Sequence, residues 1–127
     1  MSMTPDETVT AFIEALERLD LDAALEYLAE DVLYDNVPIG SVTGRDEVRN
    51  TLGGFFGATE VDWPVSRQTA TGNVVMNERV DRFKLAGGWL ELPVVGVFET
   101  NDDGLISLWR DYFDMGTFRD AMAATRG

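Results

Sequence analysis

Apolar residues near the N-terminus recur every three to four positions, which predicts a helix with one buried face. The predicted helix covers "TPDETVTAFIEALERL", residues 4–19. Thr4 is its expected N-cap, Pro5 takes the first helical position, and Glu7 completes a capping box. Its inward residues would be Val9, Phe12, Ile13, Leu16 and Leu19.

Two more helices are predicted in the first half of the chain. Asp20 can cap a short helix, and the segment "VLYDNVPIGSVTG" begins as a strand and is expected to become a loop at Pro38 and Gly40. A third helix is predicted over "GRDEVRNTLGGFF", residues 44–56, with Gly53 and Gly54 weakening its end. The short second helix would bury Leu21, Ala24, Leu25 and Leu28.

From about Thr59 the apolar period changes to two, as in strands. The turn sequences "TGN", "AGG" and "NDDG" separate four strand-like runs, which predicts an antiparallel meander. In "GTFRDAMAATRG", Thr117 is the expected cap of a short terminal helix. Helices followed by a run of strands indicate one α+β domain over residues 1–127, with a curved sheet closed on one side by helices.

Polar residues interrupt the apolar face of the second strand in this meander. Side chains alternate along a strand, so the odd positions of "VVMNERVDRFKL" share one face. If that face is inward, Arg79 and Asp81 are buried neighbours, and buried charges are costly unless they are paired. The face consists of Val75, Asn77, Arg79, Asp81, Phe83 and Leu85.

The last strand, "LISLWRDYFD", has a similar pattern. Its alternation places Asp111 with Trp109 and Phe113, and Ile106 on the opposite face. The strand between them has an apolar face made of Leu90, Leu92, Val94, Gly96 and Phe98.

In the earlier segment "YDN", Tyr34 and Asn36 share a face, while Asp35 should point the other way.

The spacing of these residues is also compatible with a purely structural role. An Arg and an Asp two positions apart are more often a surface ion pair or an interface contact than a catalytic pair. In the same way, Trp89 and Trp109 are more often packing residues than ligand platforms.

Composition narrows the possible chemistry. The 127 residues include 10 Lys and Arg against 23 Asp and Glu, a net charge of -13 that should repel phosphate backbones and anionic lipids. We therefore expect no nucleic-acid or membrane partner. No apolar run approaches the roughly 20 residues of a membrane span, and the N-terminus lacks a signal pattern, so a cytoplasmic location is expected.

The absence of cysteine and histidine excludes several kinds of site. Disulfides, thiolate nucleophiles, Cys or His zinc sites and a histidine base are all ruled out. Acid–base chemistry must then use carboxylates, Tyr or Lys. An all-oxygen metal site stays open in principle, but the acidic residues show no EF-hand spacing, and we predict no metal.

The motifs "YDN", "ERVDRF", "LPVVGVFE" and "WRDYFD", in this order, closely resemble the limonene epoxide hydrolase family over residues 34–118. The resemblance implies an α+β, nuclear-transport-factor-like or SnoaL-like cone: a strongly curved mixed sheet enclosing a deep pocket, with three to four helices closing it. It also implies a homodimer formed through the outer sheet face, where Val74, Met76 and Val80 are apolar.

The same resemblance implies the site residues. The residues that match the family's catalytic centre are Asp81, Arg79, Asp111, Tyr34 and Asn36, and none is substituted. The matching residues of the pocket wall are Phe83, Leu92, Val94, Phe113 and Phe118. The implied partners are a small hydrophobic epoxide and water, with no cofactor or metal.

Opening an epoxide requires a nucleophile at carbon and a proton for the departing oxygen. By resemblance, Asp111 takes a proton from a water held by Tyr34 and Asn36, and Asp81 protonates the epoxide oxygen. Arg79 would bridge the two carboxylates, which are expected to share one proton.

Two alternatives stay open. One is an isomerase or polyketide-type cyclase on the same fold, and the other is a non-catalytic module that binds a small molecule. An arginine between two aspartates favours water activation over a single base facing an oxyanion.

Overall fold

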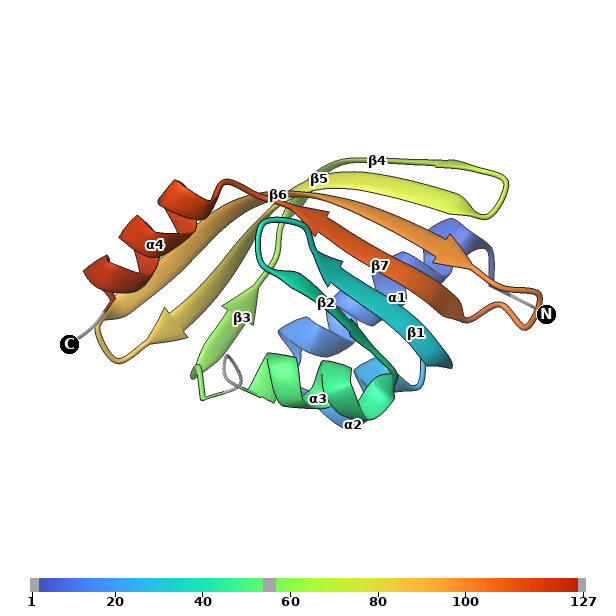
Figure 1. Ribbon diagram of the computed structural model, residues 1–127, viewed down its shortest axis with the longest axis horizontal. Helices are drawn as coiled ribbons and strands as arrows, with labels where there is room; N and C mark the ends of the chain where they lie inside the picture. The colour runs from blue at the N-terminus through green and yellow to red at the C-terminus, as the bar shows by residue number, and fades with distance from the viewer. Residues whose placement is uncertain (1–2, 54–56, 126–127) are drawn as a thin grey trace.

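The computed structural model describes residues 3–53 and 57–125, which form helices packed on a strongly curved mixed sheet. The helices are α1 (Pro5–Glu17), α2 (Leu21–Leu25), α3 (Arg45–Gly53) and α4 (Met115–Ala124). The strands are β1 (Leu28–Asn36), β2 (Gly40–Thr43), β3 (Glu60–Asp62), β4 (Val65–Thr71), β5 (Val74–Leu85), β6 (Gly88–Thr100) and β7 (Ile106–Tyr112). Figure 1 shows β5, β6 and β7 arching over α1, with α2 and α3 on the same side of the sheet. The predicted α+β cone is therefore correct.

Two of the three predicted helix caps are confirmed. Glu7 N–H donates to Thr4 Oγ1 at 3.2 Å and Thr4 N–H donates to Glu7 Oε1 at 2.9 Å, which is the predicted capping box. Asp20 Oδ1 accepts from Ala23 N–H at 3.1 Å. The predicted cap of α4 is wrong, because Asp114 is its N-cap and accepts from Thr117 N–H at 2.8 Å. A carboxylate three residues before a free N–H group satisfies it as well as a hydroxyl does.

The sheet has the strand order β2-β1-β7-β6-β5-β3, and β4 also pairs with β5. Pairing is antiparallel from β4 through β7, which confirms the meander, whereas β1 runs parallel to β7. The first predicted run is divided into β3 and β4 at Trp63 and Pro64. Pro64 has no N–H to donate to β5, which interrupts the strand pairing at this point. Its carbonyl still accepts a hydrogen bond from Val80 N–H at 3.2 Å.

Two local predictions are wrong for a tertiary reason. The segment read as a loop from Gly40 forms β2, an edge strand that pairs with β1 although its burial pattern shows no apolar alternation. Ile106 is fully buried, not on the outer face, because the register shifts between Glu99 and Thr100 where β6 pairs with β7. Leu28, expected in the second helix, is buried as predicted but begins β1.

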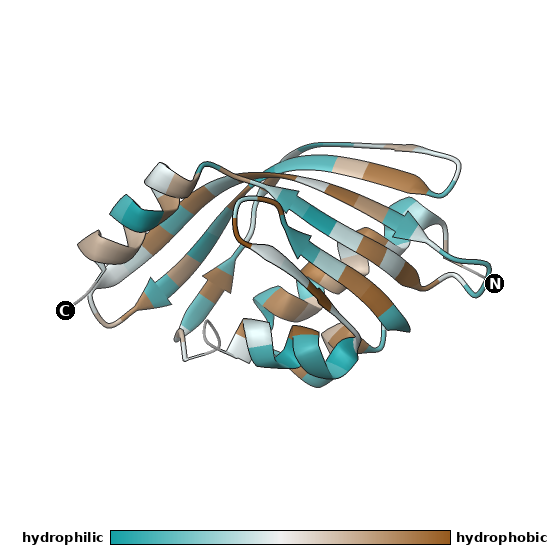
Figure 2. Ribbon diagram, in the orientation of Figure 1, coloured by the Kyte–Doolittle hydropathy of each residue, from teal (hydrophilic) through white to brown (hydrophobic). Residues whose placement is uncertain are grey.

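The core lies between the concave face of the sheet and α1. Phe12 of α1 packs edge-on against Trp109, with ring centroids 5.0 Å apart, and Phe98 lies parallel to Trp109 at 6.3 Å. Figure 2 shows hydrophobic and hydrophilic residues alternating along the long strands, as the period of two predicted. This alternation directs one set of side chains into the concave side.

Helices α3 and α4 close parts of the concave side. The predicted third helix extends to residue 56, but its part at 54–56, including Gly54, lies outside the described residues. Helix α4 contacts β6 and reaches the β5–β6 turn, where a Cβ at Gly87 would collide with the Thr125 carbonyl. Figure 1 shows α4 lying beside β6 at this end of the sheet. No helix in the described part of the chain is both long and apolar enough to span a membrane.

Candidate active site

The polar residues singled out in the sequence meet on the concave face of the sheet. Asp81 and Arg79 come from β5, and Asp111 comes from β7. Strand β6 lies between them, and its Gly96 pairs with both Asn77 of β5 and Asp111 of β7. Because glycine has no side chain, the guanidinium of Arg79 can pass over β6 and reach Asp111.

The guanidinium of Arg79 is bound along all of its edges. Nε donates to Asp81 Oδ1 at 2.7 Å, and Nη2 donates to Asp81 Oδ2 at 3.2 Å and to Asp111 Oδ2 at 2.8 Å. Nη1 donates to Asn77 Oδ1 at 2.9 Å. Its faces are covered by aromatic rings, with Trp63 at 5.0 Å and Phe98 at 5.9 Å from the guanidinium carbon. The cation is thus held in one orientation and shielded from water.

Asp111 has a second hydrogen-bond donor that the sequence interpretation did not identify. Trp109 Nε1–H donates to Asp111 Oδ1 at 2.9 Å, so each carboxylate oxygen accepts one hydrogen bond. The ring of Tyr34 stacks on Trp109 with centroids 3.9 Å apart, and Asn36 lies opposite Asp111 where β1 pairs with β7. The parallel pairing of β1 with β7 therefore brings "YDN" beside "WRD".

Burial dominates the titration of the two aspartates. The pKa of Asp81 is raised to about 7, because burial and the negative charge of Asp111 together outweigh the lowering effect of Arg79. Burial also raises the pKa of Asp111, against the lowering effects of Arg79 and of the hydrogen bond from Trp109. With one proton shared between the carboxylates, the charges of Arg79, Asp81 and Asp111 sum to zero. A neutral trio is the form that burial favours.

Two neighbouring groups stay protonated at neutral pH. The pKa of Arg79 is raised, because Asp111 and Asp81 outweigh the effect of its burial. The pKa of Tyr34 is also raised, by burial and by the charge of Asp111. The Tyr34 hydroxyl can therefore act as a hydrogen-bond donor beside the carboxylates.

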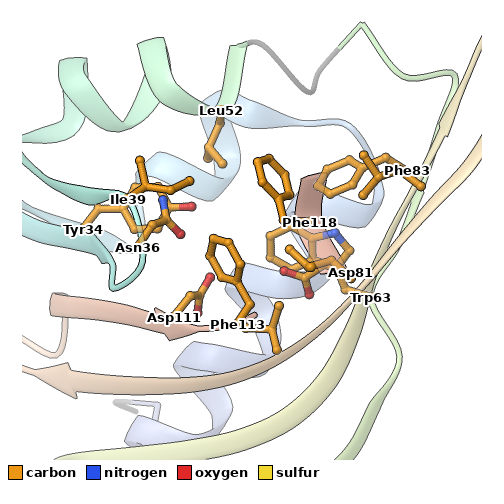
Figure 3. Close-up of a pocket in the computed structure, with 13 residues that line it drawn as sticks. Tyr34, Asn36, Ile39, Leu52, Trp63, Asp81, Phe83, Asp111, Phe113 and Phe118 are labelled. Atoms are coloured by element: carbon orange, nitrogen blue, oxygen red, sulfur yellow. The ribbon is translucent and has the colours of Figure 1, made fainter. Parts of the chain in front are cut away.

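A cavity of about 60 Å³, measured as the space open to the centres of water molecules, lies in front of the two aspartates. That volume has room for a few water molecules or a small ligand. Figure 3 shows Asp81 and Asp111 facing one another across it, with Tyr34 and Asn36 on the side of Asp111. The lining residues are Tyr34, Asn36, Ile39, Leu52, Trp63, Asp81, Phe83, Leu90, Leu92, Val94, Asp111, Phe113 and Phe118.

Nine of the ten sequence-predicted site residues line this cavity, including all five of the predicted apolar wall. The tenth, Arg79, lies behind the carboxylates with a side chain that is 0% exposed. It can therefore reach the cavity only through Asp81 and Asp111.

Sequence reasoning missed several contributors to the site. Ile39, Leu52, Trp63 and Leu90 also line the cavity. Gly96 makes room for Arg79, Asn77 binds its third nitrogen, and Trp109 donates to Asp111. Asn77 carried a usable signal, because it lies on the same strand face as Arg79 and Asp81. Trp63 precedes the break in the edge strand at Pro64, so strand alternation gave no guide to its direction.

Comparison with known proteins identifies the family. The model of the limonene-1,2-epoxide hydrolase catalytic domain matches residues 3–124. The chain is 36% identical over 107 residues to the epoxide hydrolase EphG of Mycobacterium tuberculosis, covering 84% of this chain and 71% of that protein.

Solved structures of related proteins share the fold. The structure of an LEH-like epoxide hydrolase from M. tuberculosis superposes with a TM-score of 0.82 at 30% identity, covering 95% of this chain and 90% of that one. A proposed polyketide cyclase from Xanthomonas campestris superposes with a TM-score of 0.78 at 25% identity, covering 95% and 96%. The fold is thus shared with other activities, whereas the family model and the mycobacterial relatives point to one of them. The protein belongs to the limonene-1,2-epoxide hydrolase family.

Proposed function

We propose that the protein converts a small, uncharged, hydrophobic epoxide of terpene-like or cyclic type to a vicinal diol by direct attack of water. The observation that carries this proposal is the pair of buried aspartates, joined by Arg79, that face one apolar cavity. Two carboxylates that share one proton supply both the base and the acid that epoxide opening needs.

The asymmetry of the two carboxylates supports separate roles. Asp111 accepts hydrogen bonds from two different residues, Arg79 and Trp109, which favours its ionised form. Asp81 accepts only from Arg79 among the hydrogen bonds of the described residues, and its pKa of about 7 keeps it partly protonated at neutral pH. We assign Asp111 as the base and Asp81 as the acid.

In the proposed step, Asp111 takes a proton from water while the water oxygen forms a bond to an epoxide carbon. The bond from that carbon to the ring oxygen breaks, and the ring oxygen receives the proton of Asp81. Tyr34 and Asn36, beside Asp111, would hold the water. Turnover leaves the proton on Asp111, and its return to Asp81 is best carried by a water in the cavity, because the raised pKa of Arg79 disfavours loss of its proton.

The lining of the cavity supports a hydrophobic, uncharged substrate. Apart from the two aspartates and Tyr34, no residue of the lining is ionisable in the described part of the chain. Arg79, Asp81 and Asp111 with one shared proton are already neutral together. A charged substrate would therefore bury an unpaired charge in the cavity, which is unfavourable. The apolar wall is formed by Phe83, Leu92, Val94, Phe113 and Phe118 together with Ile39, Leu52, Trp63 and Leu90.

The test is incubation with a panel of terpene, cyclic meso and aromatic epoxides, with the diol detected directly. Diol formation from at least one of them above the spontaneous rate supports the proposal. A cyclase or isomerase on this fold would instead rearrange a carbonyl substrate without adding water. Failure on every epoxide, with the protein folded, would reject the hydrolase assignment.

We further propose a homodimer formed through the outer face of the sheet. That face exposes Met76 of β5, Val95 of β6 and Tyr112 of β7, which are 48%, 44% and 45% exposed. Apolar side chains gathered on one sheet face are typical of a surface that is covered by a partner. Sedimentation over a wide concentration range tests this, and a monomer throughout would contradict it.

A further inference from the structure

The third nitrogen of Arg79 binds neither aspartate. Nη1 donates to Asn77 Oδ1 at 2.9 Å, on a residue that is 3% exposed. We infer that Asn77 is a positioning residue for the hydrolysis proposed above: its amide fixes the orientation of Arg79 and keeps the third edge of that cation free of a countercharge. The kinetic part of this inference rests on the proposed function, whereas its electrostatic part does not.

The orientation of the Asn77 amide is determined by its partners. Arginine is only a donor, so Asn77 must present its oxygen to Arg79 and direct its nitrogen elsewhere. Asn77 Nδ2–H donates to Gln68 Oε1 at 3.1 Å, and Gln68 Nε2–H donates in turn to Asp6 Oδ1 at 2.7 Å and to Thr10 Oγ1 at 3.1 Å.

This series of hydrogen bonds has a single direction. It begins at Arg79, which can only donate, and ends at Asp6 of α1, which can only accept when ionised. Flipping either amide would bring two donors or two acceptors together. Helix α1 therefore holds the Asn77 oxygen toward Arg79 through Gln68, and Asn77 holds Nη2 of Arg79 between the aspartates.

The opposite side of Asn77 is shaped by Gly96. A Cβ at Gly96 would collide with Arg79 Nη1 and lie 3.0 Å from Asn77 Oδ1. The strand pairing that places Gly96 opposite Asn77 thus leaves a slot that the guanidinium fills. Gly96 and Asn77 together therefore fit the orientation of Arg79 that bridges the two aspartates.

The neutrality of Asn77 matters for the shared proton. Arg79 with two carboxylates and one proton has no net charge, and an amide completes the hydrogen bonding of Arg79 without changing that sum. An aspartate at position 77 would add a third negative charge beside the same cation. Like charges favour protonation, so the carboxylates would bind protons at higher pH.

The test uses Asn77→Asp, Asn77→Leu and the same two substitutions at Asn73. Asn73 lies in the β4–β5 turn, on the same hairpin as Asn77. Its side chain donates to the Thr100 carbonyl at the end of β6 at 2.8 Å, a contact outside the cavity lining. The carboxyl groups are titrated by carbon-13 NMR, and kcat and KM are measured against pH with an epoxide that the wild type hydrolyses.

The expected result is specific to position 77. Asn77→Asp raises the apparent pKa of the buried carboxylates by about one unit or more, and the acidic limb of the rate profile moves to higher pH with it. Asn77→Leu lowers kcat by about tenfold to a hundredfold because Arg79 is displaced, with a smaller change in KM. Both Asn73 variants keep the wild-type titration and pH profile.

Gln68→Leu serves if the Asn77 variants do not fold, because it removes the group that orients Asn77 and otherwise only the contacts of Gln68 with Asp6 and Thr10. It should lower kcat with a shifted carboxyl titration and little change in the melting temperature. An unchanged titration in Asn77→Asp, or in Gln68→Leu where the Asn77 variants are unfolded, would overturn the inference. The NMR titration decides it even if the wild type hydrolyses no epoxide, a result that would reject only the proposed function.

Discussion

Trp109 donates its indole hydrogen to Asp111 Oδ1 at 2.9 Å, from two positions earlier on the same strand. Residues two apart on a strand share a face, so a buried tryptophan and a buried carboxylate can meet this way without any distortion. Tyr34 stacks on the same indole at 3.9 Å. Trp109 therefore connects the core to the carboxylate that we assign as the base.

We predict that Trp109→Phe moves the acidic limb of the pH–rate profile to higher pH. The hydrogen bond from Trp109 lowers the pKa of Asp111, so its loss raises that pKa and reduces the ionised fraction in mildly acidic solution. The control is Trp89→Phe, since Trp89 lies under Arg82, at 4.3 Å from its guanidinium carbon, and away from the cavity lining. Identical profiles for Trp109→Phe and wild type would show that this hydrogen bond has no effect on the base.

Asp111→Asn and Asp81→Asn should each lower turnover by about a hundredfold or more, as expected when a general base or acid is removed. Both substitutions keep the size of the side chain. Asp35→Asn is the matched control, because Asp35 lies on the other face of β1 and pairs with Arg110 at 2.8 Å. Diol formation near the wild-type rate by either buried variant, with its melting temperature unchanged, would refute the assigned roles.

The free energy of unfolding should fall as pH rises from about 4 to about 7. Asp81 has a folded-state pKa of about 7 against an ordinary pKa of 3.8, so the folded protein binds this proton more tightly than the unfolded chain does. The stabilisation is complete below the unfolded pKa and is lost as pH rises through the folded one. Urea titrations of wild type and Asp81→Asn at several pH values isolate this contribution, since the asparagine variant lacks it. A difference between the two proteins that is constant from pH 4 to 8 would contradict the raised pKa.

Direct attack by water predicts where oxygen from the solvent goes in one turnover. With enzyme in excess over epoxide in heavy-oxygen water, the first diol should carry the label and Asp111 none. A carboxylate nucleophile would instead give its own unlabelled oxygen to the first diol. Mass analysis of the diol and of the peptide that contains Asp111 separates the two mechanisms, and label in that peptide would make Asp111 a nucleophile.

Much of the site could be predicted from the sequence because strand alternation is a local property. Side chains point to opposite faces along any strand without a bulge, so Arg79 and Asp81 had to share a face with Val75 and Phe83. The same holds for the helix caps, since Thr4 and Glu7 meet within one turn. The ordered motifs then connected these faces to a family and its pocket.

What the sequence alone determined is therefore the direction of the side chains in the regular parts of each strand or helix. Only the tertiary structure decided which of them meet: Arg79 reaches Asp111, 32 positions away, because β6 lies between their strands and Gly96 leaves room for the guanidinium. It also decided that Ile106 is buried and that Gly40 begins an edge strand, because register shifts and edge pairing depend on the neighbouring strand. Those contacts are fixed by cross-strand register and close approach, which no local pattern of apolar and polar residues encodes.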